Sequence, residues 1–174
     1  CENFDMVPDI LVIGKGLGGG IIPLAAVIAR EDLDVAGDRA LGHYTYEKSP
    51  VACAAALATI EYIEEHDLTE HARQMGRYAM ERMEVMMADH PLIGDVRGLG
   101  LLMGMELVRD RATRARATDE AEAVMYSALS KGLSFKTTMG NILALTPPLT
   151  ITRQEMDQAL DILEESLIEV QSET

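Results

Sequence analysis

Apolar residues recur at three- and four-residue spacing along four stretches of the chain, and this spacing is typical of amphipathic helices. The stretches cover residues 50–66, 68–89, 119–131 and 153–170. Pro50 stands at the first position of the first stretch, where a helix leaves the backbone N–H unpaired in any case. The larger apolar residues of that stretch are its expected buried face: Val51, Leu57, Ile60 and Ile63.

Capping signals mark the starts of the later helices. Asp67 with Glu70 and Thr152 with Glu155 have the spacing of a capping box. Thr118 is the expected N-cap of the third helix. The second and last helices have long apolar faces that we expect to form core: Leu68, Ala72, Met75, Ala79, Met83 and Met86, then Met156, Leu160, Leu163, Leu167 and Val170.

Short apolar runs between turn signals predict strands. Residues 9–13 are expected to form a buried strand of a parallel sheet. Residues 23–29 are expected to form a second strand or, because alanine is common in them, a short helix. Further strands are expected later in the chain: residues 95–100, 101–108, 133–136 and 142–146. Residues 31–49 read as a surface loop.

The mixture of strands and helices indicates an α/β protein. We expect two parts. Residues 1–89 would form an α/β layer, and residues 90–174 a smaller α/β unit of short strands with covering helices.

The charge balance argues against nucleic acid as a partner. The 174 residues include 15 Lys and Arg against 29 Asp and Glu, a formal net charge of −14. Binding to phosphate backbones needs clustered basic side chains. The one basic cluster reads as a solvated loop: Arg109, Arg111, Arg114 and Arg116.

Cysteine usage and hydropathy favour a cytoplasmic protein. Cys1 and Cys53 form neither a disulfide framework nor a metal-ligand spacing. Cys53 lies in an alanine-rich helical run, so we expect a small buried thiol. We expect no membrane span and no signal peptide, because no apolar stretch has the required length.

A glycine-rich segment follows the first strand, and five of the seven residues 14–20 are glycine. Such a run disfavours regular structure, so a loop is expected. A triphosphate-binding loop does not fit, because Lys15 is followed by glycine at the wrong spacing. A dinucleotide fingerprint matches the glycine spacing, but the later glycines and Pro23 oppose the helix that must begin there.

The third interpretation is a lysine nucleophile. An amine at a strand end, in a tight loop with little side-chain crowding, can form a Schiff base with a cofactor aldehyde. Flanking glycines also let a bulky ring approach the backbone. We therefore expect Lys15 to be the catalytic residue. The alternative is that Lys15 is an ordinary solvated lysine in a surface loop.

Residues 8–29 resemble the lysine segment of class III aminotransferases, which are fold-type-I enzymes that use pyridoxal 5′-phosphate. Residues 43–46 and 49–57 resemble the family's threonine loop and the helix after it. Residues 96–101 resemble a strand of its small domain, and residues 147–151 the segment before its last helix. The resemblance covers essentially the whole chain in the right order.

The resemblance implies roles for two residues. Lys15 would hold pyridoxal 5′-phosphate as a Schiff base and then move a proton as the free amine. Thr45 would hydrogen-bond the cofactor phosphate in the neighbouring subunit's site, so a homodimer is implied. The implied reaction transfers an amino group from an amine or ω-amino donor to a keto acid or aldehyde. Residues 1–89 would end the large cofactor domain, and residues 90–174 would be the small C-terminal domain.

The chain also departs from the family pattern. It begins after the family's pyridinium-binding aspartate, so we expect about the second half of an enzyme, inactive by itself. Lys48 and Ser49 stand where a Gly-Asn pair is usual, which alters the expected loop. Ala144 stands where many members have an arginine for the substrate carboxylate. This favours an ω-amine substrate, or an ammonia-lyase or decarboxylase on the same cofactor; a non-catalytic remnant is the alternative of another class.

Four other residues are candidates for lesser roles. His43 is expected to position the threonine loop, and Arg97 to form a salt bridge at a strand edge. Lys136 and Asn141 flank the strand of Ala144 and are candidates for substrate recognition. The other histidines lack metal-ligand spacing, so no metal site is expected.

Overall fold

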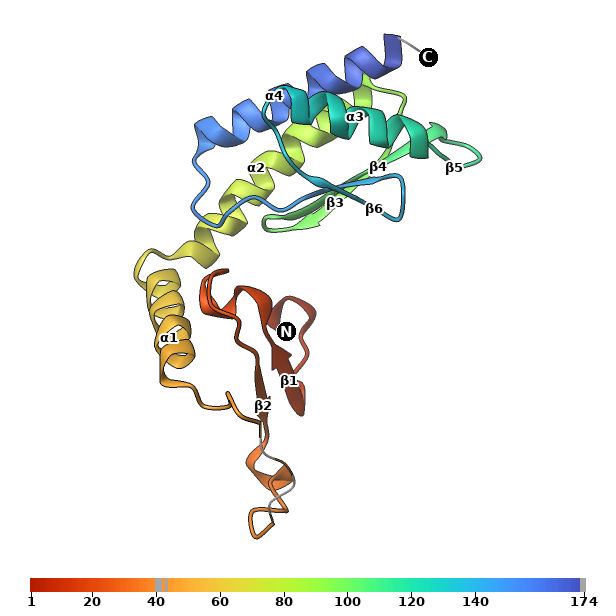
Figure 1. The fold of residues 1–174 in the computed structure, drawn as a ribbon. Helices are drawn as coiled ribbons and strands as arrows, with labels where there is room; N and C mark the ends of the chain where they lie inside the picture. Colours follow the sequence, from red (N-terminus) through yellow and green to blue (C-terminus); the bar gives the residue numbers. More distant parts are fainter. Residues whose placement is uncertain (40–41, 43, 173–174) are drawn as a thin grey trace. The chain divides into compact units, whose positions relative to one another are not determined.

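The computed structural model describes residues 1–39, 42 and 44–172 of the chain. The chain divides into two compact units, Cys1–His66 and Asp67–Thr174 (Figure 1). The helix of residues 68–89, which the sequence analysis grouped with the preceding residues, packs with the sheet of the second unit.

The first unit consists of a small sheet, a tight turn and one helix. Its elements are η1 (Glu2–Phe4), β1 (Ile10–Ile13), η2 (Lys15–Gly18), β2 (Ala26–Ala29), η3 (Glu31–Leu33) and α1 (Pro50–Glu65). β1 and β2 pair antiparallel, with Ile10 opposite Ala29 and Ile13 opposite Ala26. The predicted buried strand of a parallel sheet is therefore wrong for this chain: β1 joins a two-stranded antiparallel sheet, and Ile10 and Val12 are 54% and 70% exposed.

Helix α1 has the predicted bounds but a different buried face. Ala52 and Ala56 are buried, whereas the larger Val51 and Leu57 are exposed. Cys53 is exposed as well, which corrects its predicted burial. α1 packs against the η2 turn, and small side chains on the facing side let the two backbones approach closely.

The second unit is a sheet with three helices. Its elements are α2 (Leu68–Asp89), β3 (Ile93–Leu99), β4 (Leu102–Asp110), β5 (Ala115–Arg116), α3 (Thr118–Ser130), β6 (Lys136–Thr138), β7 (Ile142–Leu145) and α4 (Arg153–Ser172). The strand order is β3-β4-β7-β6, and every pair is antiparallel. The short strand β5 pairs with β4.

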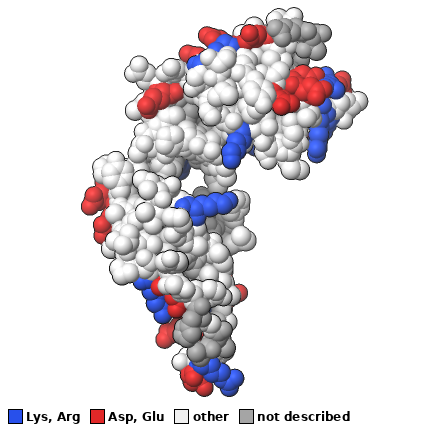
Figure 2. Space-filling model, viewed as in Figure 1, with Lys and Arg blue, Asp and Glu red and all other residues white. Residues whose placement is uncertain are grey.

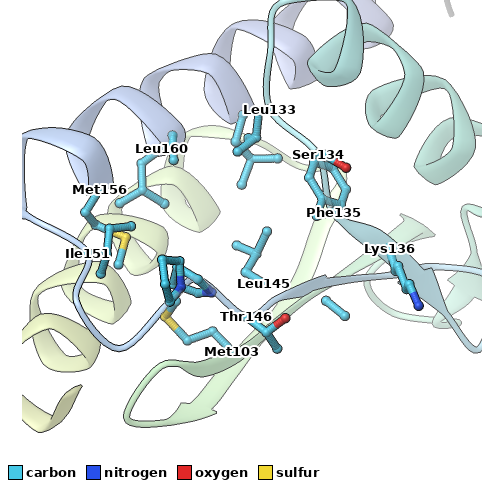
Figure 3. A pocket seen from close by; sticks show the side chains of 15 residues that line it. Met103, Leu133, Ser134, Phe135, Lys136, Leu145, Thr146, Ile151, Met156 and Leu160 are labelled. Carbon is cyan, nitrogen blue, oxygen red and sulfur yellow. The ribbon is translucent and has the colours of Figure 1, made fainter. Parts of the chain in front are cut away.

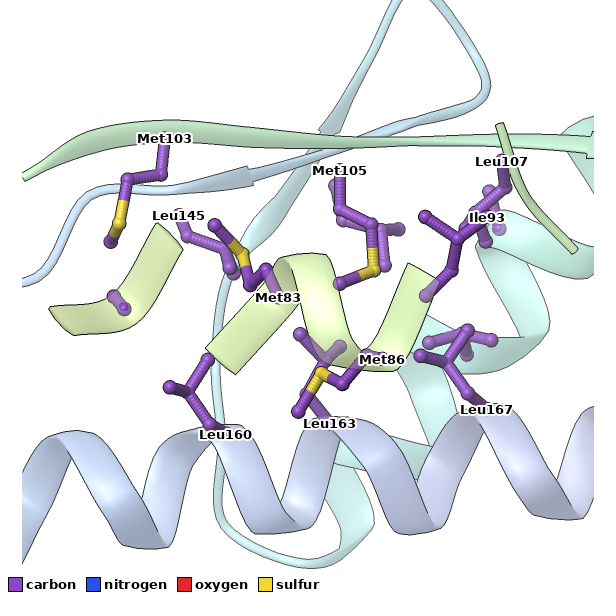
Figure 4. Packing of buried hydrophobic residues seen from close by; sticks show 14 of the residues in the cluster. Met83, Met86, Ile93, Met103, Met105, Leu107, Leu145, Leu160, Leu163 and Leu167 are labelled. Carbon is purple, nitrogen blue, oxygen red and sulfur yellow. The ribbon is translucent and has the colours of Figure 1, made fainter. Parts of the chain in front are cut away.

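One face of this sheet is covered by helices. α2 packs on β3 and β4, α3 packs on β4, β6 and β7, and α4 packs on α2 and α3. Figure 4 shows Met103, Met105 and Leu107 of β4 pointing toward Met83 and Met86 of α2. The predicted core faces of α2 and α4 are confirmed; Ala72 alone is only partly buried.

The capping predictions have mixed outcomes. Thr152 and Glu155 form the predicted box: the Thr152 N–H donates to Glu155 Oε2 at 2.8 Å, and the Glu155 N–H donates to Thr152 Oγ1 at 3.2 Å. Asp67 has left-handed backbone angles and makes no capping hydrogen bond, and Glu70 accepts from Arg73. Thr118 is the first residue of α3 rather than its N-cap.

All four arginines of the predicted solvated loop are exposed, and Arg109 and Arg111 also make specific contacts. Arg109 pairs with Asp119 at 2.7 Å and with Glu120 at 2.6 Å. The Arg111 guanidinium donates to the carbonyls of Ile93 and His90 at 2.9 Å and to that of Met87, so it caps the C-terminal end of α2. On the face drawn in Figure 2, described basic side chains lie singly or beside acidic ones.

Candidate active site

Lys15 follows β1 after one residue, Gly14, and is the first residue of η2, a short 3-10 turn. A loop was predicted for residues 14–20, and the structure refines this to one helical turn followed by two glycines of positive φ, Gly19 and Gly20. Lys15 itself has a φ of 53°, in the left-handed region that residues with a Cβ rarely adopt. Such conformations cluster at functional sites. The Lys15 side chain is exposed.

The path of the chain after the turn excludes the dinucleotide interpretation. That fingerprint requires a helix whose N-terminus faces the pyrophosphate. Here the chain leaves η2 and returns along β2, antiparallel to β1. No α-helix begins at residues 14–29, all of which the structure describes.

Helix α1 supports the lysine turn from behind. The turn packs against α1, and a Cβ on Gly19 would lie 3.1 Å from Thr59 Oγ1. The Thr59 hydroxyl is held by donating to the Ala55 carbonyl at 2.8 Å. Glycine is therefore needed at position 19 for its positive φ and for this close approach.

An ion cluster closes the other end of the hairpin. Arg30 donates to Asp9 at 2.5 Å and to Asp32 at 2.9 and 2.6 Å. The hydrogen bonds from Arg30 hold the pKa of Asp32 below its usual range. The group ties the two strands together at the end away from Lys15.

Thr45 is exposed, in a turn of residues 45–48. The Glu47 N–H donates to the Tyr44 carbonyl at 3.0 Å within the same loop. Within the described part of the first unit, no hydrogen bond joins Lys15 to Thr45. His43, the predicted loop-positioning residue, lies outside the described residues.

The candidates in the second unit have separate roles. Arg97 forms the expected salt bridges, with Glu106 at 2.8 Å and with Asp95. Asn141 is buried, and its side-chain amide donates to the Leu107 carbonyl at 2.8 Å. This bond makes Asn141 an anchor of the β6–β7 hairpin rather than a substrate contact. In the sequence, Asn141 follows Gly140, and a Gly-Asn pair is typical of a hairpin turn; Gly140 indeed has a positive φ.

An apolar cavity of about 660 Å³ lies between β7 and α4. Figure 3 shows Leu145, Met156 and Leu160 around it. Lys136 also borders the cavity, but its side chain points away from Leu145 and Leu160 in this view. The cavity is thus lined mainly by core residues.

The lysine turn fits a covalently held aldehyde cofactor. The amine of Lys15 is exposed at a strand end, as attack on an aldehyde requires. Beside it, a Cβ on Gly16 would meet no atom within 4 Å, so the backbone there is open to a flat ring. Among the described residues, no group of three His, Cys, Asp or Glu side chains could hold a metal ion.

Membrane insertion has no support from the helices. None of those in the described ranges is long and apolar enough to cross a bilayer.

Relatives of known activity match nearly the whole chain, among them an ammonia-lyase and a racemase. It is 50% identical over 97% of its residues to the (R)-1-hydroxy-2-aminoethylphosphonate ammonia-lyase of Vibrio splendidus, covering 35% of that protein. It is 45% identical over 98% of its residues to the leucine/methionine racemase of Thermococcus litoralis, covering 38% of that protein. The chain therefore spans little more than a third of the length of these relatives.

A solved structure and a family model agree on the classification. The crystal structure of a Bacillus anthracis aminotransferase superimposes with a TM-score of 0.88 at 34% identity, over 97% of this chain and 40% of that one. The fold is thus the mixed α/β fold of these transferases. The family model described as Aminotransferase class-III matches residues 1–167. With a match of this extent, the chain belongs to the class III aminotransferase family.

Proposed function

We propose that the protein carrying this chain uses pyridoxal 5′-phosphate on Lys15 to transfer an amino group. The donor would be an amine or ω-amino compound, and the acceptor a keto acid or aldehyde. The observation that carries the proposal is the exposed Lys15 amine, between glycines at a strand end, in a class III aminotransferase chain.

The roles of the residues follow from the chemistry of the cofactor. When bound, pyridoxal phosphate supplies an aldehyde for nitrogen and a ring that withdraws electrons. Lys15 would hold the cofactor through Nζ. As the free amine, it would then move a proton between the substrate carbon and the cofactor carbon. The left-handed backbone of Lys15 and the packing of its turn against α1 would fix the direction in which the side chain leaves the backbone.

Trapping with borohydride tests this assignment. Reduction of the full-length protein, followed by peptide mass spectrometry, should find the pyridoxyl group on Lys15. Lys15→Ala should abolish turnover and the label. Lys131→Ala is the control, because it removes another exposed lysine, at the end of α3, and should leave both unchanged. Label on any other lysine would contradict the proposal.

A second candidate, an ammonia-lyase, is favoured by the 50% identity to the Vibrio splendidus enzyme and by Ala144. Supplying an amine with pyruvate to the full-length protein separates the two. Alanine formed in step with amine loss means transfer, whereas free ammonia without a keto acceptor means elimination. Interconversion of enantiomers with neither product would point to racemisation, as in the Thermococcus litoralis relative.

We also propose a cytoplasmic homodimer in which Thr45 contacts the cofactor phosphate of the partner subunit's site. The free, exposed thiol of Cys53 fits a reducing compartment. Mixed dimers test the shared site. Lys15→Ala and Thr45→Ala subunits should each be impaired alone, but a heterodimer of the two contains one intact site. Recovery of activity on mixing supports the sharing of Thr45, and no recovery in verified heterodimers contradicts it.

A further inference from the structure

A polar pocket of about 400 Å³ lies at the β3 edge of the second unit's sheet. Two irregularities in strand pairing lie beside it: the register of β3 on β4 shifts between Ile93 and Asp95, and that of β4 on β5 shifts between Val108 and Asp110. Bulges of this kind re-aim side chains and are common next to functional sites. The charged residues that line the pocket are Arg97, Arg111, Arg114, Asp95 and Glu106.

The charges around this pocket do not cancel. Three guanidinium groups face two carboxylates, in a chain whose formal net charge is −14. Arg97 donates to Glu106 at 2.8 Å and also to Asp95, so a single guanidinium engages both carboxylates. Among the residues that the structure describes, neither Arg111 nor Arg114 has a carboxylate partner. The part of the pocket formed by these two arginines therefore favours an anion.

Arg111 is held in place by neutral acceptors. Its Nε donates to the Ile93 carbonyl and its Nη2 to the His90 carbonyl, both at 2.9 Å, and Nη2 also donates to the Met87 carbonyl. Carbonyl groups leave the charge of the guanidinium uncancelled. Nη1 donates to no acceptor in the described ranges, so its N–H groups are available to a ligand. Because the guanidinium is already ordered, a ligand that binds it loses little affinity to side-chain ordering.

Arg114 borders the pocket from the loop between β4 and β5. Asp110 fixes this loop, because its carboxylate accepts from the Thr113 N–H at 2.6 Å and from the Thr113 hydroxyl at 2.8 Å. Arg114 follows with a φ of 57°, in the left-handed region. Its side chain is exposed and forms no ion pair or hydrogen bond with the described part of the chain. The second cation of the pocket is therefore free to bind a ligand.

We propose that this pocket binds a phosphate group, free or at the end of a small phosphate ester, between Arg111 and Arg114. The fork of one guanidinium is enough to match a planar carboxylate. A phosphate carries at least three strong acceptor oxygens that point in different directions, so two guanidinium groups from separate segments can bind it together. Bound phosphate would tie the β4–β5 loop to the C-terminal end of α2, which Arg111 caps.

Calorimetric titration of the full-length protein with inorganic phosphate, at an ionic strength held constant with chloride, tests the site. Arg114→Gln should weaken phosphate binding about ten- to a hundredfold, because charge-assisted hydrogen bonds are lost. Arg116→Gln is the matched control, because Arg116 is an exposed cation of the same hairpin that does not line the pocket. It should change the affinity less than about twofold. Phosphate bound elsewhere on the protein is common to all three proteins, so the comparison isolates the pocket.

Thermal unfolding provides a second measurement. A ligand that binds the folded state raises Tm, so phosphate should raise the Tm of the wild type and of Arg116→Gln above the value in chloride, and this increase should be lost in Arg114→Gln. No phosphate binding by the wild type, binding unchanged in Arg114→Gln, or equal losses in both glutamine variants would overturn the proposal. Acetate binding as tight as phosphate binding would overturn the preference for a phosphate group. Titration with glycerol phosphate identifies the source: tighter binding than that of inorganic phosphate supports an ester, and weaker binding supports the free ion.

Discussion

Gly76→Ala tests a close backbone contact in the second unit. Gly76 lies in α2, where the helix crosses the turn between β3 and β4. A Cβ built on Gly76 would lie 2.2 Å from the Gly100 carbonyl oxygen and 2.5 Å from its carbon. Both are backbone atoms, so no rotamer change can relieve the overlap. Gly100 also has a φ of 56°, which restricts how the turn can move.

The magnitude follows from two opposing effects. An ordinary contact begins at 3.4 Å, so helix and turn would have to separate by about 1.2 Å. Overpacking of a core typically costs about 1–3 kcal/mol, and a backbone overlap of this size belongs at the upper end. Replacing glycine by alanine in a helix returns about 1 kcal/mol. We expect a net loss of about 2 kcal/mol in the free energy of unfolding.

Urea unfolding of the protein, followed by far-ultraviolet circular dichroism, measures this loss. Thr69→Ala is the matched control, because Thr69 is exposed in the same helix. It should change the free energy of unfolding by less than about 0.5 kcal/mol. A Gly76→Ala protein as stable as the wild type, or more stable, would refute the close approach of α2 to this turn.

Three further substitutions test other contacts. Met83→Ala should cost about 2–5 kcal/mol in urea unfolding, because the side chain is fully buried between sheet and helices; a loss under about 1 kcal/mol would contradict that packing. Arg111→Lys should lower the free energy of unfolding by about 1–2 kcal/mol, because one ammonium cannot reach all three carbonyls that the guanidinium caps; an unchanged midpoint would argue against the cap. Glu155→Gln concerns a carboxyl whose pKa is lowered by hydrogen bonds from the Thr152 N–H and hydroxyl. The stabilisation by the Glu155 carboxylate is present above its unfolded pKa and is lost as pH falls through its folded pKa. The Tm of the wild type should therefore exceed that of the variant by less as the pH is lowered. A Tm difference that does not change with pH would contradict this prediction.

The sequence predicted those parts of the fold and of the candidate site that depend on residues close to one another in the chain. The apolar period of residues 68–89 gave α2 its bounds and buried face, since each core residue sits one helical turn from the next. The capping box at Thr152 works within one turn and was confirmed. Lys15 was predicted as the site residue because a strand, a glycine run and a proline follow one another directly in the chain.

Contacts between distant segments decided the rest. In α1 most positions are apolar, so its period could not indicate which face meets the η2 turn, and the close backbone approach selected Ala52 and Ala56. The antiparallel return of β2 excluded the dinucleotide site, although the glycine spacing allowed it. The sequence by itself determined the family and predicted the lysine. Only the tertiary structure placed Lys136 opposite Ala144, because strand register is set by the packing of one whole sheet face against its helices.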